Sequence, residues 1–167
     1  MAATSTNKQP LLVDRVFHEA YDMNAYKVTS NTTTPGNVTG ANTAIKVLDS
    51  ITEDGAVIEC IYAIARGTTA YKINFYYSSQ GDYLRPDQAV YIGQMTAADT
   101  VNSRVEWAVM PAVLAPVPAM AEPGGQLRAL YLPKGKAMWA AVQLDAGIDI
   151  NTQLVDAPIV GLQGGFY

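Results

Sequence analysis

Hydrophobic and polar residues alternate along most of the chain in short runs that are separated by turn-forming residues. The clearest run covers residues 56–65. Its faces carry Val57, Glu59, Ile61, Ala63 and Ala65 on one side, and Ile58, Cys60, Tyr62 and Ile64 on the other. Both faces are largely apolar, which is typical of a strand covered on two sides. A turn at 67–69 and a second alternating run at 70–77 follow, so the sequence predicts a hairpin here.

Comparable runs predict further strands at 44–48, 89–95, 101–109, 127–132, 137–144 and 153–162. We interpret residues 11–18 as either a first strand or an extended clamp laid against a neighbour. The segment 110–125 contains four prolines, which remove backbone donors, so we expect an extended loop there. Helical spacing of apolar residues is weak throughout, and 20–26 is the one mild helical candidate.

About eight short strands with frequent turn signals predict an all-β fold, a jelly roll or β-sandwich. The first ten residues are small and polar and end in a proline, and residues 30–43 are rich in Asn, Thr and Gly. Such segments favour arms and surface loops. We therefore expect an extended N-terminal arm and loop over residues 1–39 and one jelly-roll β-sandwich domain over residues 40–167.

Composition sharpens this picture. The chain has 167 residues, 15 acidic and 11 basic, for a formal net charge of −4, and only 16% of its residues are charged. A typical share is about 25%, so we expect an unusually neutral surface. Because the basic residues are scattered, neither nucleic acid nor an anionic membrane is an expected partner. The longest uncharged apolar stretch, 107–121, contains three prolines, and the N-terminus lacks the apolar core of a secretory signal.

Candidate chemistry is sparse. The single histidine, His18, excludes a metal site of the cupin type, and we expect it to be solvated or hydrogen-bonded in the arm region. The single cysteine, Cys60, is expected to be a small, inert core residue. Asp145, Asp149 and Asn151 could offer oxygen ligands to calcium, but they lack the spacing of a known calcium loop. We therefore predict no catalytic, cofactor-binding or metal-ligating residues, and no enzymatic activity.

The chain from residue 40 onward carries the most specific pattern. Its parts are Gly40-Ala41-Asn42-Thr43-Ala44-Ile45, then Gly67-Thr68-Thr69 before an aromatic strand, then Leu132-Pro133-Lys134-Gly135 before a strand rich in alanine, and a terminal Gly164-Gly165-Phe166. In these motifs, which span about residues 40–167, the chain resembles the capsid decoration or cement proteins of tailed bacteriophages, small virion proteins with a jelly-roll fold.

The resemblance implies a virion structural protein that binds the outer surface of a phage head and bridges neighbouring capsomers. Its implied partners are the major capsid protein and two further copies in a homotrimer, and it would be made in the host cytoplasm. An alternative is a carbohydrate- or receptor-binding module of a tail or spike, in which tyrosines, Trp107 and Trp139 stack on sugar rings. The ten tyrosines fit a core or sheet role and an interface role equally.

Overall fold

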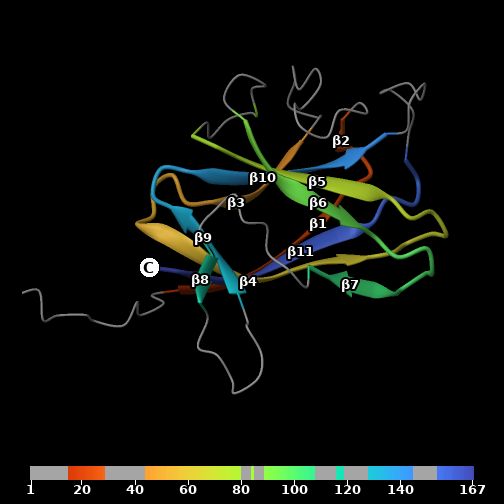
Figure 1. Ribbon diagram of the computed structural model, residues 1–167. Helices are drawn as coiled ribbons and strands as arrows, with labels where there is room; N and C mark the ends of the chain where they lie inside the picture. Colours follow the sequence, from red (N-terminus) through yellow and green to blue (C-terminus); the bar gives the residue numbers. More distant parts are fainter. Residues whose placement is uncertain are drawn as a thin grey trace, which may run out of the picture.

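The computed structural model describes residues 15–28, 44–79, 84, 89–107, 116–118, 128–144 and 154–167. Every regular element in these ranges is a β-strand, and the strands form two sheets. The sheets lie face to face as the two layers of a β-sandwich (Figure 1). The expectation of an all-β sandwich is therefore confirmed. Over the described ranges, no helix is long and apolar enough to cross a membrane.

The first sheet contains six strands. They are β1 (Arg15–Asp22), β4 (Gly55–Ile64), β7 (Arg104–Glu106), β8 (Pro116–Pro118), β9 (Arg128–Pro133) and β11 (Ile159–Phe166). Their order is β1–β11–β4–β9–β8, and β7 also pairs with β4. All of these pairings are antiparallel. The sheet thus joins strands from both ends of the chain.

The second sheet contains five strands. They are β2 (Lys27–Val28), β3 (Ile45–Asp49), β5 (Lys72–Ser78), β6 (Val90–Thr96) and β10 (Ala137–Gln143). Their order is β2–β10–β5–β6, and β3 also pairs with β10. Only the short pairing of β2 with β10 is parallel among these. The strands predicted at 44–48, 89–95 and 137–144 are found here with small shifts of their ends.

The predicted hairpin over residues 56–77 is wrong. β4 pairs with β11, β7 and β9 in the first sheet, whereas β5 pairs with β10 and β6 in the second. The turn at 67–69 therefore leads the chain from one sheet to the other. Alternation reports which face of a strand is apolar, but two strands on opposite sides of one core show the same pattern as two paired strands.

Residues 15–28, which we expected in the arm, belong to the sandwich. β1 pairs with β11 along its whole length, and Phe17 and Met23 are buried in the core. The helical candidate at 20–26 is also wrong, because the strand continues to Asp22 and a turn follows, closed by a bond from the Tyr26 amide to the Met23 carbonyl. The other residues of the expected arm, 1–14 and 29–39, lie outside the described residues.

A β-bulge at Glu59 breaks the alternation of β4. Two consecutive residues of β11 pair with Ile58 and Cys60, so Glu59 has no opposite residue. Both Ile58 and Ile61 therefore face the core, although strict alternation placed them on opposite faces. The bulge turns the side chain of Cys60 to the outer face of the sheet.

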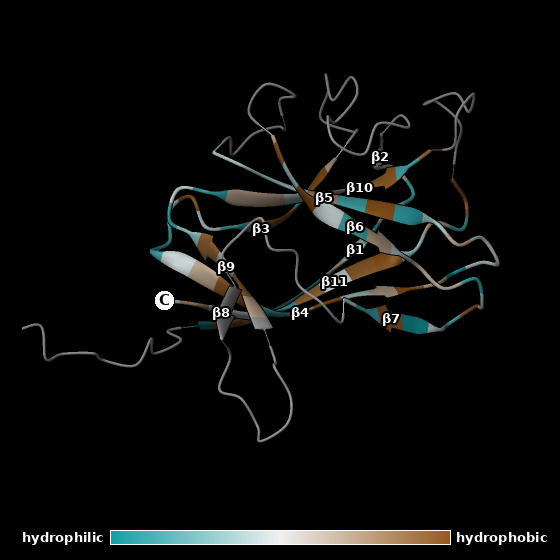
Figure 2. Ribbon diagram, viewed as in Figure 1, coloured by the Kyte–Doolittle hydropathy of each residue, from teal (hydrophilic) through white to brown (hydrophobic). Residues whose placement is uncertain are grey.

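The core fills the space between the two sheets. Its fully buried side chains include Val47, Ile58, Ile61, Ile73, Phe75, Leu130, Leu132, Met138, Val160 and Leu162. They come from six strands of both sheets, and the apolar colour along β11 is visible in Figure 2. Burial of this apolar area is the main stabilising contribution to the fold.

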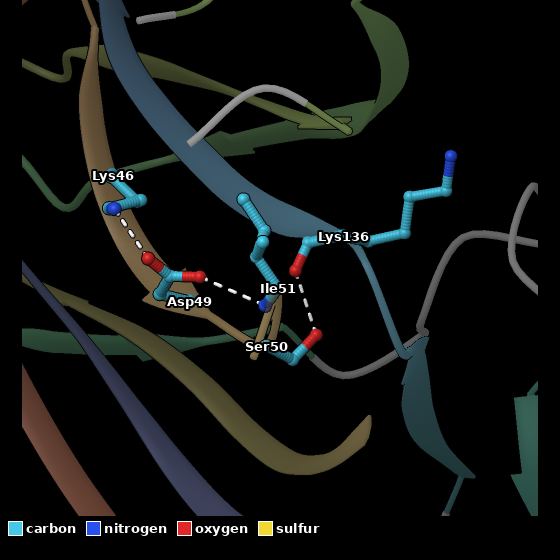
Figure 3. Close-up of polar contacts among 5 residues, drawn as sticks. All are labelled: Lys46, Asp49, Ser50, Ile51 and Lys136. Carbon is cyan, nitrogen blue, oxygen red and sulfur yellow. Dashed lines mark hydrogen bonds and ion pairs between the residues drawn. The ribbon is translucent and has the colours of Figure 1, made fainter. Parts of the chain in front are cut away.

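Ser50 ties the end of β3 to the turn between β9 and β10 (Figure 3). Its buried hydroxyl lies 2.7 Å from the carbonyl oxygen of Lys136 and 3.1 Å from that of Pro133. In return, the Gly135 amide donates to the Ser50 carbonyl at 3.1 Å. Gly135 has φ +78°, a conformation that favours glycine. The Leu-Pro-x-Gly motif therefore forms a turn that is fixed by a buried serine.

Candidate interaction surface

The outer face of the first sheet carries a row of uncharged residues that crosses four strands. Register places Val16, Gly165, Val57 and Tyr131 side by side. Val16 is 80% exposed, and Val57 and Tyr131 are half-buried. We call these four residues the apolar row. A surface of this kind suits contact with another macromolecule, because apolar side chains and glycines are cheap to desolvate.

Two stacked tyrosines end the apolar row. The rings of Tyr131 and Tyr167 lie 5.5 Å apart between centroids, at an interplanar angle of 16°. Tyr167 also lies against Gly55, where a Cβ atom would stand 2.4 Å from the tyrosine hydroxyl oxygen. Gly55 thus makes room for the last residue of the chain.

A polar cluster lies beside the apolar row on the same face. The Tyr62 hydroxyl and the His18 Nε2 atom are hydrogen-bonded at 2.6 Å, and the Arg104 guanidinium lies 4.1 Å from the centroid of the Tyr62 ring. Arg104 also forms an ion pair with Glu106 at 2.8 Å. The close approach of the Tyr62 ring to Gly161 completes the arrangement. His18 is therefore hydrogen-bonded, as we predicted, but it lies in strand β1 of the sandwich.

Cys60 does not belong to the core, and the prediction of a buried thiol is wrong. It is half-buried on the outer face, and the Arg104 guanidinium donates to its sulfur atom at 3.6 Å. The bulge at Glu59 is the physical reason for this placement. The only histidine and the only cysteine of the chain thus share one face. Nowhere in the described ranges do three or more histidine, cysteine or carboxylate side chains gather as a metal site would need.

The outer face of the second sheet is covered. A second cluster of buried residues lies there, made of Ala44, Tyr76, Leu84, Ala137, Trp139 and Ala141. The rings of Tyr76 and Tyr91 lie 5.8 Å apart. Burial raises the pKa of the Tyr76 hydroxyl far above its usual range and also raises the pKa of Tyr91. These tyrosines serve packing.

Three buried donors on this face have no hydrogen-bond partner among the described residues: the Asn74 amide nitrogen, the Tyr76 hydroxyl and the Trp139 indole nitrogen. The Asn74 side-chain oxygen accepts a bond from Gln94 at 2.8 Å. Gln94 also donates to Gln143 at 2.6 Å, so the amides of three strands are linked. This polar group and the aromatic cluster occupy neighbouring positions on one face.

The tryptophans do not present open faces for stacking. Trp107 is half-buried, with its ring centroid 4.9 Å from that of Phe75, and Trp139 is 4% exposed. Of the nine tyrosines that the structure describes, two are buried and seven are half-buried. The core or sheet role accordingly fits most of them.

Ten charged side chains on the described strands and turns form five ion pairs at the surface. The ion pairs are Arg15 with Glu53, Lys46 with Asp49, Arg66 with Asp22, Arg104 with Glu106, and Lys134 with Asp54. Such exposed pairs add little stability, but they leave the surface close to neutral. Pairing therefore places charges of opposite sign next to each other, so that they offset one another locally on the surface.

Some candidates lie outside the described residues. They are Asp145, Asp149 and Asn151, the possible calcium ligands. Of the proline-rich segment 110–125, the structure describes only β8.

Comparison of the chain with protein-family models, with curated proteins and with solved structures finds no match to any of them.

Proposed function

We propose that the chain is a virion structural protein, a decoration or cement subunit that binds the outer surface of a tailed-phage head and bridges neighbouring capsomers. The single observation that carries this proposal is the apolar row on the outer face of the first sheet. An uncharged row that includes the 80% exposed Val16 and the half-buried Val57 and Tyr131 offers a docking surface for a large partner. In this role the partner is the major capsid protein.

The order of the strands supports a jelly roll as the finer description of the fold. The order β1–β11–β4–β9 lies opposite β3–β10–β5–β6. Along the chain, these eight strands change sheet at every connection except the one from β5 to β6. Two four-stranded sheets connected in this way are the pattern of jelly rolls, which occur in capsid and lectin domains. The fold alone does not decide between those functions.

Three of the four motifs that carry the family resemblance have structural roles in this fold, and residues 40–43 of the first motif lie outside the described residues. The segment at Gly67 and the segment at Gly135 both lead from the first sheet to the second. At Gly164, a Cβ atom would stand 2.0 Å from the Val57 carbonyl oxygen and 2.8 Å from the Phe17 ring. Because the motifs serve the sandwich, they support the jelly-roll proposal more strongly than they support the partner.

A cement subunit gains from several weak contacts. The homotrimer that the resemblance implies would present three copies of the apolar row to the shell. A contact that is lost at one copy re-forms at high effective concentration while the others hold. A cyclic trimer also closes upon itself, so it does not grow into a filament. Tight binding to particles therefore needs no strong single site.

The alternative of a carbohydrate- or receptor-binding module is supported less well. Sugar stacking needs an accessible aromatic face. Trp139 is 4% exposed, and Trp107 packs on Phe75. Binding to glycans but not to shells would favour this alternative.

Co-sedimentation with purified capsids of the phage that encodes the chain tests the proposal. We expect the wild-type chain to sediment with the capsids and Val57→Lys to remain mostly in the supernatant, because a charge would be buried in the contact. Val155→Lys is the matched control, since Val155 is 72% exposed and lies outside the apolar row. Equal sedimentation of both variants, or none by the wild type, would count against the proposal.

A further inference from the structure

Strand β1 differs from the other strands at the edges of the two sheets. Edge strands expose unpaired backbone groups, and proteins commonly protect them by short length, prolines or bulges. β8 has three residues and includes Pro116 and Pro118, and β7 and β2 have three and two residues. The pairings of β3 and β6 are interrupted by register shifts. Each of these five edge strands therefore carries a protective feature.

β1 carries none of these three features. It has eight residues without proline, and all eight pair with β11 in continuous register. Its other edge has no strand partner among the described residues. Its charged residues are Arg15, Glu19 and Asp22. Arg15 pairs with Glu53 and Asp22 pairs with Arg66, so Glu19 alone has no ion pair with a described residue. This edge is therefore a template for main-chain pairing with another chain.

We propose that the free edge of β1 pairs antiparallel with β1 of a second copy of this chain, about a twofold axis at His18. The pairing requires no capsid, so it stands independently of the proposed function. It joins subunits in twos through identical surfaces and is separate from the threefold contact that the family resemblance implies.

The alternation of side chains restricts the register of such a pair. Phe17 faces the core, while His18 faces outward to Tyr62. In a continuous sheet, residues opposite each other share a face, so inward residues must meet inward residues. The axis must therefore pass through a residue. Near the middle of β1, the choices are His18 and Glu19.

Charge decides between these two registers. An axis at Glu19 places two carboxylates directly opposite each other, which is destabilising. An axis at His18 places Arg15 opposite Tyr21 of the second copy and diagonal to Glu19 of the second copy. Glu19 forms no ion pair with any described residue, and this register brings Arg15 of the second copy, which also pairs with Glu53 of its own subunit, close to it. The second copy is thus favoured as the occupant of this edge.

The contact is small. Eight residues of strand extend over roughly 26 Å, and one pair of edges buries less than the standard area of about 800 Å² per partner. We therefore expect a weak dimer whose population depends on concentration, and not an obligate one. Such an association fits a role in which other contacts act at the same time.

Analytical ultracentrifugation of the full chain over a range of concentrations tests the pairing. We expect reversible dimers for the wild type and dissociation that is about tenfold easier for Glu19→Lys, in which two Lys–Arg15 repulsions replace two attractions. Glu59→Lys makes the same charge change at an exposed site away from β1 and should dimerise as the wild type does. A monomer at all concentrations, or equal effects of both variants, would overturn the proposal.

Disulfide trapping tests the register in the Cys60→Ala background. We expect His18→Cys to form covalent dimers on oxidation, because residues opposite each other lie within disulfide reach. Val16→Cys should not, since its two copies would lie roughly 13 Å apart along the strands. Equal trapping of both variants would contradict the His18 axis. If the wild type dimerises but neither cysteine variant forms a covalent dimer, the dimer uses another contact and the proposal is overturned. If an added peptide from a shell protein displaces the second copy from β1, the edge binds that protein instead, and the proposal is also overturned.

Discussion

The ring of Tyr62 lies so close to Gly161 on the neighbouring strand that a Cβ atom at position 161 would stand 2.0 Å from the ring. Gly161→Ala must therefore displace Tyr62 from His18 and Arg104. We expect this variant to lose about 1–3 kcal/mol of unfolding free energy, because overpacking in a tight site carries a cost of that order. Urea unfolding measures the loss.

Gln163→Ala is the control for that substitution. Gln163 lies two residues further along β11 on the same face, and it is exposed. Surface changes of this kind usually alter stability by no more than about 0.5 kcal/mol. If Gly161→Ala proved as stable as Gln163→Ala, the packing of Tyr62 over Gly161 would be contradicted.

Ser50→Ala tests the connection between the end of β3 and the turn that joins β9 to β10. The substitution removes the hydroxyl that contacts the Lys136 and Pro133 carbonyls, and it leaves those acceptors less well satisfied. We expect a loss of about 1–3 kcal/mol, read from thermal or urea unfolding. Ser79→Ala, at an exposed serine, should change stability little. Similar values for the two variants would show that Ser50 does not tie the turns together.

Because of Tyr76, we expect the unfolding free energy of the protein to fall in alkaline solution. Burial raises its pKa in the folded chain, so the folded state keeps the phenolic proton where the unfolded state releases it. The folded state then binds more protons, and the stabilising contribution, fully present below about pH 10, declines as the pH rises further. The pKa values of Tyr21 and Tyr91 are also raised, mainly by burial.

Tyr76→Phe isolates this effect. We expect the unfolding free energy of the variant to fall less steeply above about pH 10, by up to about 1.4 kcal/mol per pH unit. At neutral pH the variant should be at least as stable as the wild type, because the buried hydroxyl lacks a described partner. Urea unfolding at several pH values measures both, and parallel pH profiles would contradict the prediction.

Cys60 should react in the folded protein. It is half-buried on the outer face beside Arg104, so iodoacetamide should modify it under native conditions. Ala63→Cys in a Cys60→Ala background places a thiol at a fully buried position of the same strand and should react only after denaturation. Mass spectrometry reads both. If Cys60 were protected from iodoacetamide to the same degree as the cysteine at position 63, the result would show that Cys60 is buried in the core.

The positions of most strands follow from the sequence, because alternation and turn residues are local signals. The partners of the strands do not follow. β4 and β5 have the pattern of a hairpin, yet they lie in different sheets. The bulge at Glu59 also left no local signal, and it placed Ile58 and Cys60 on opposite faces of β4, although strict alternation puts them on the same face.

The polar cluster could not be predicted from the sequence either, since His18 and Tyr62 are 44 positions apart along the chain. One signal could have indicated it. A glycine inside a predicted strand, such as Gly161, often marks a close approach by another group. The apolar row needed the register of four strands, which no local pattern contains.

The most direct test of the central claim is three-dimensional electron microscopy of purified capsids that are saturated with the chain. We predict sandwich-shaped density on the outer surface of the shell, spanning neighbouring capsomers, with the apolar row of the first sheet against the shell. Capsids without added density, or density confined to the tail, would contradict the assignment as a cement protein.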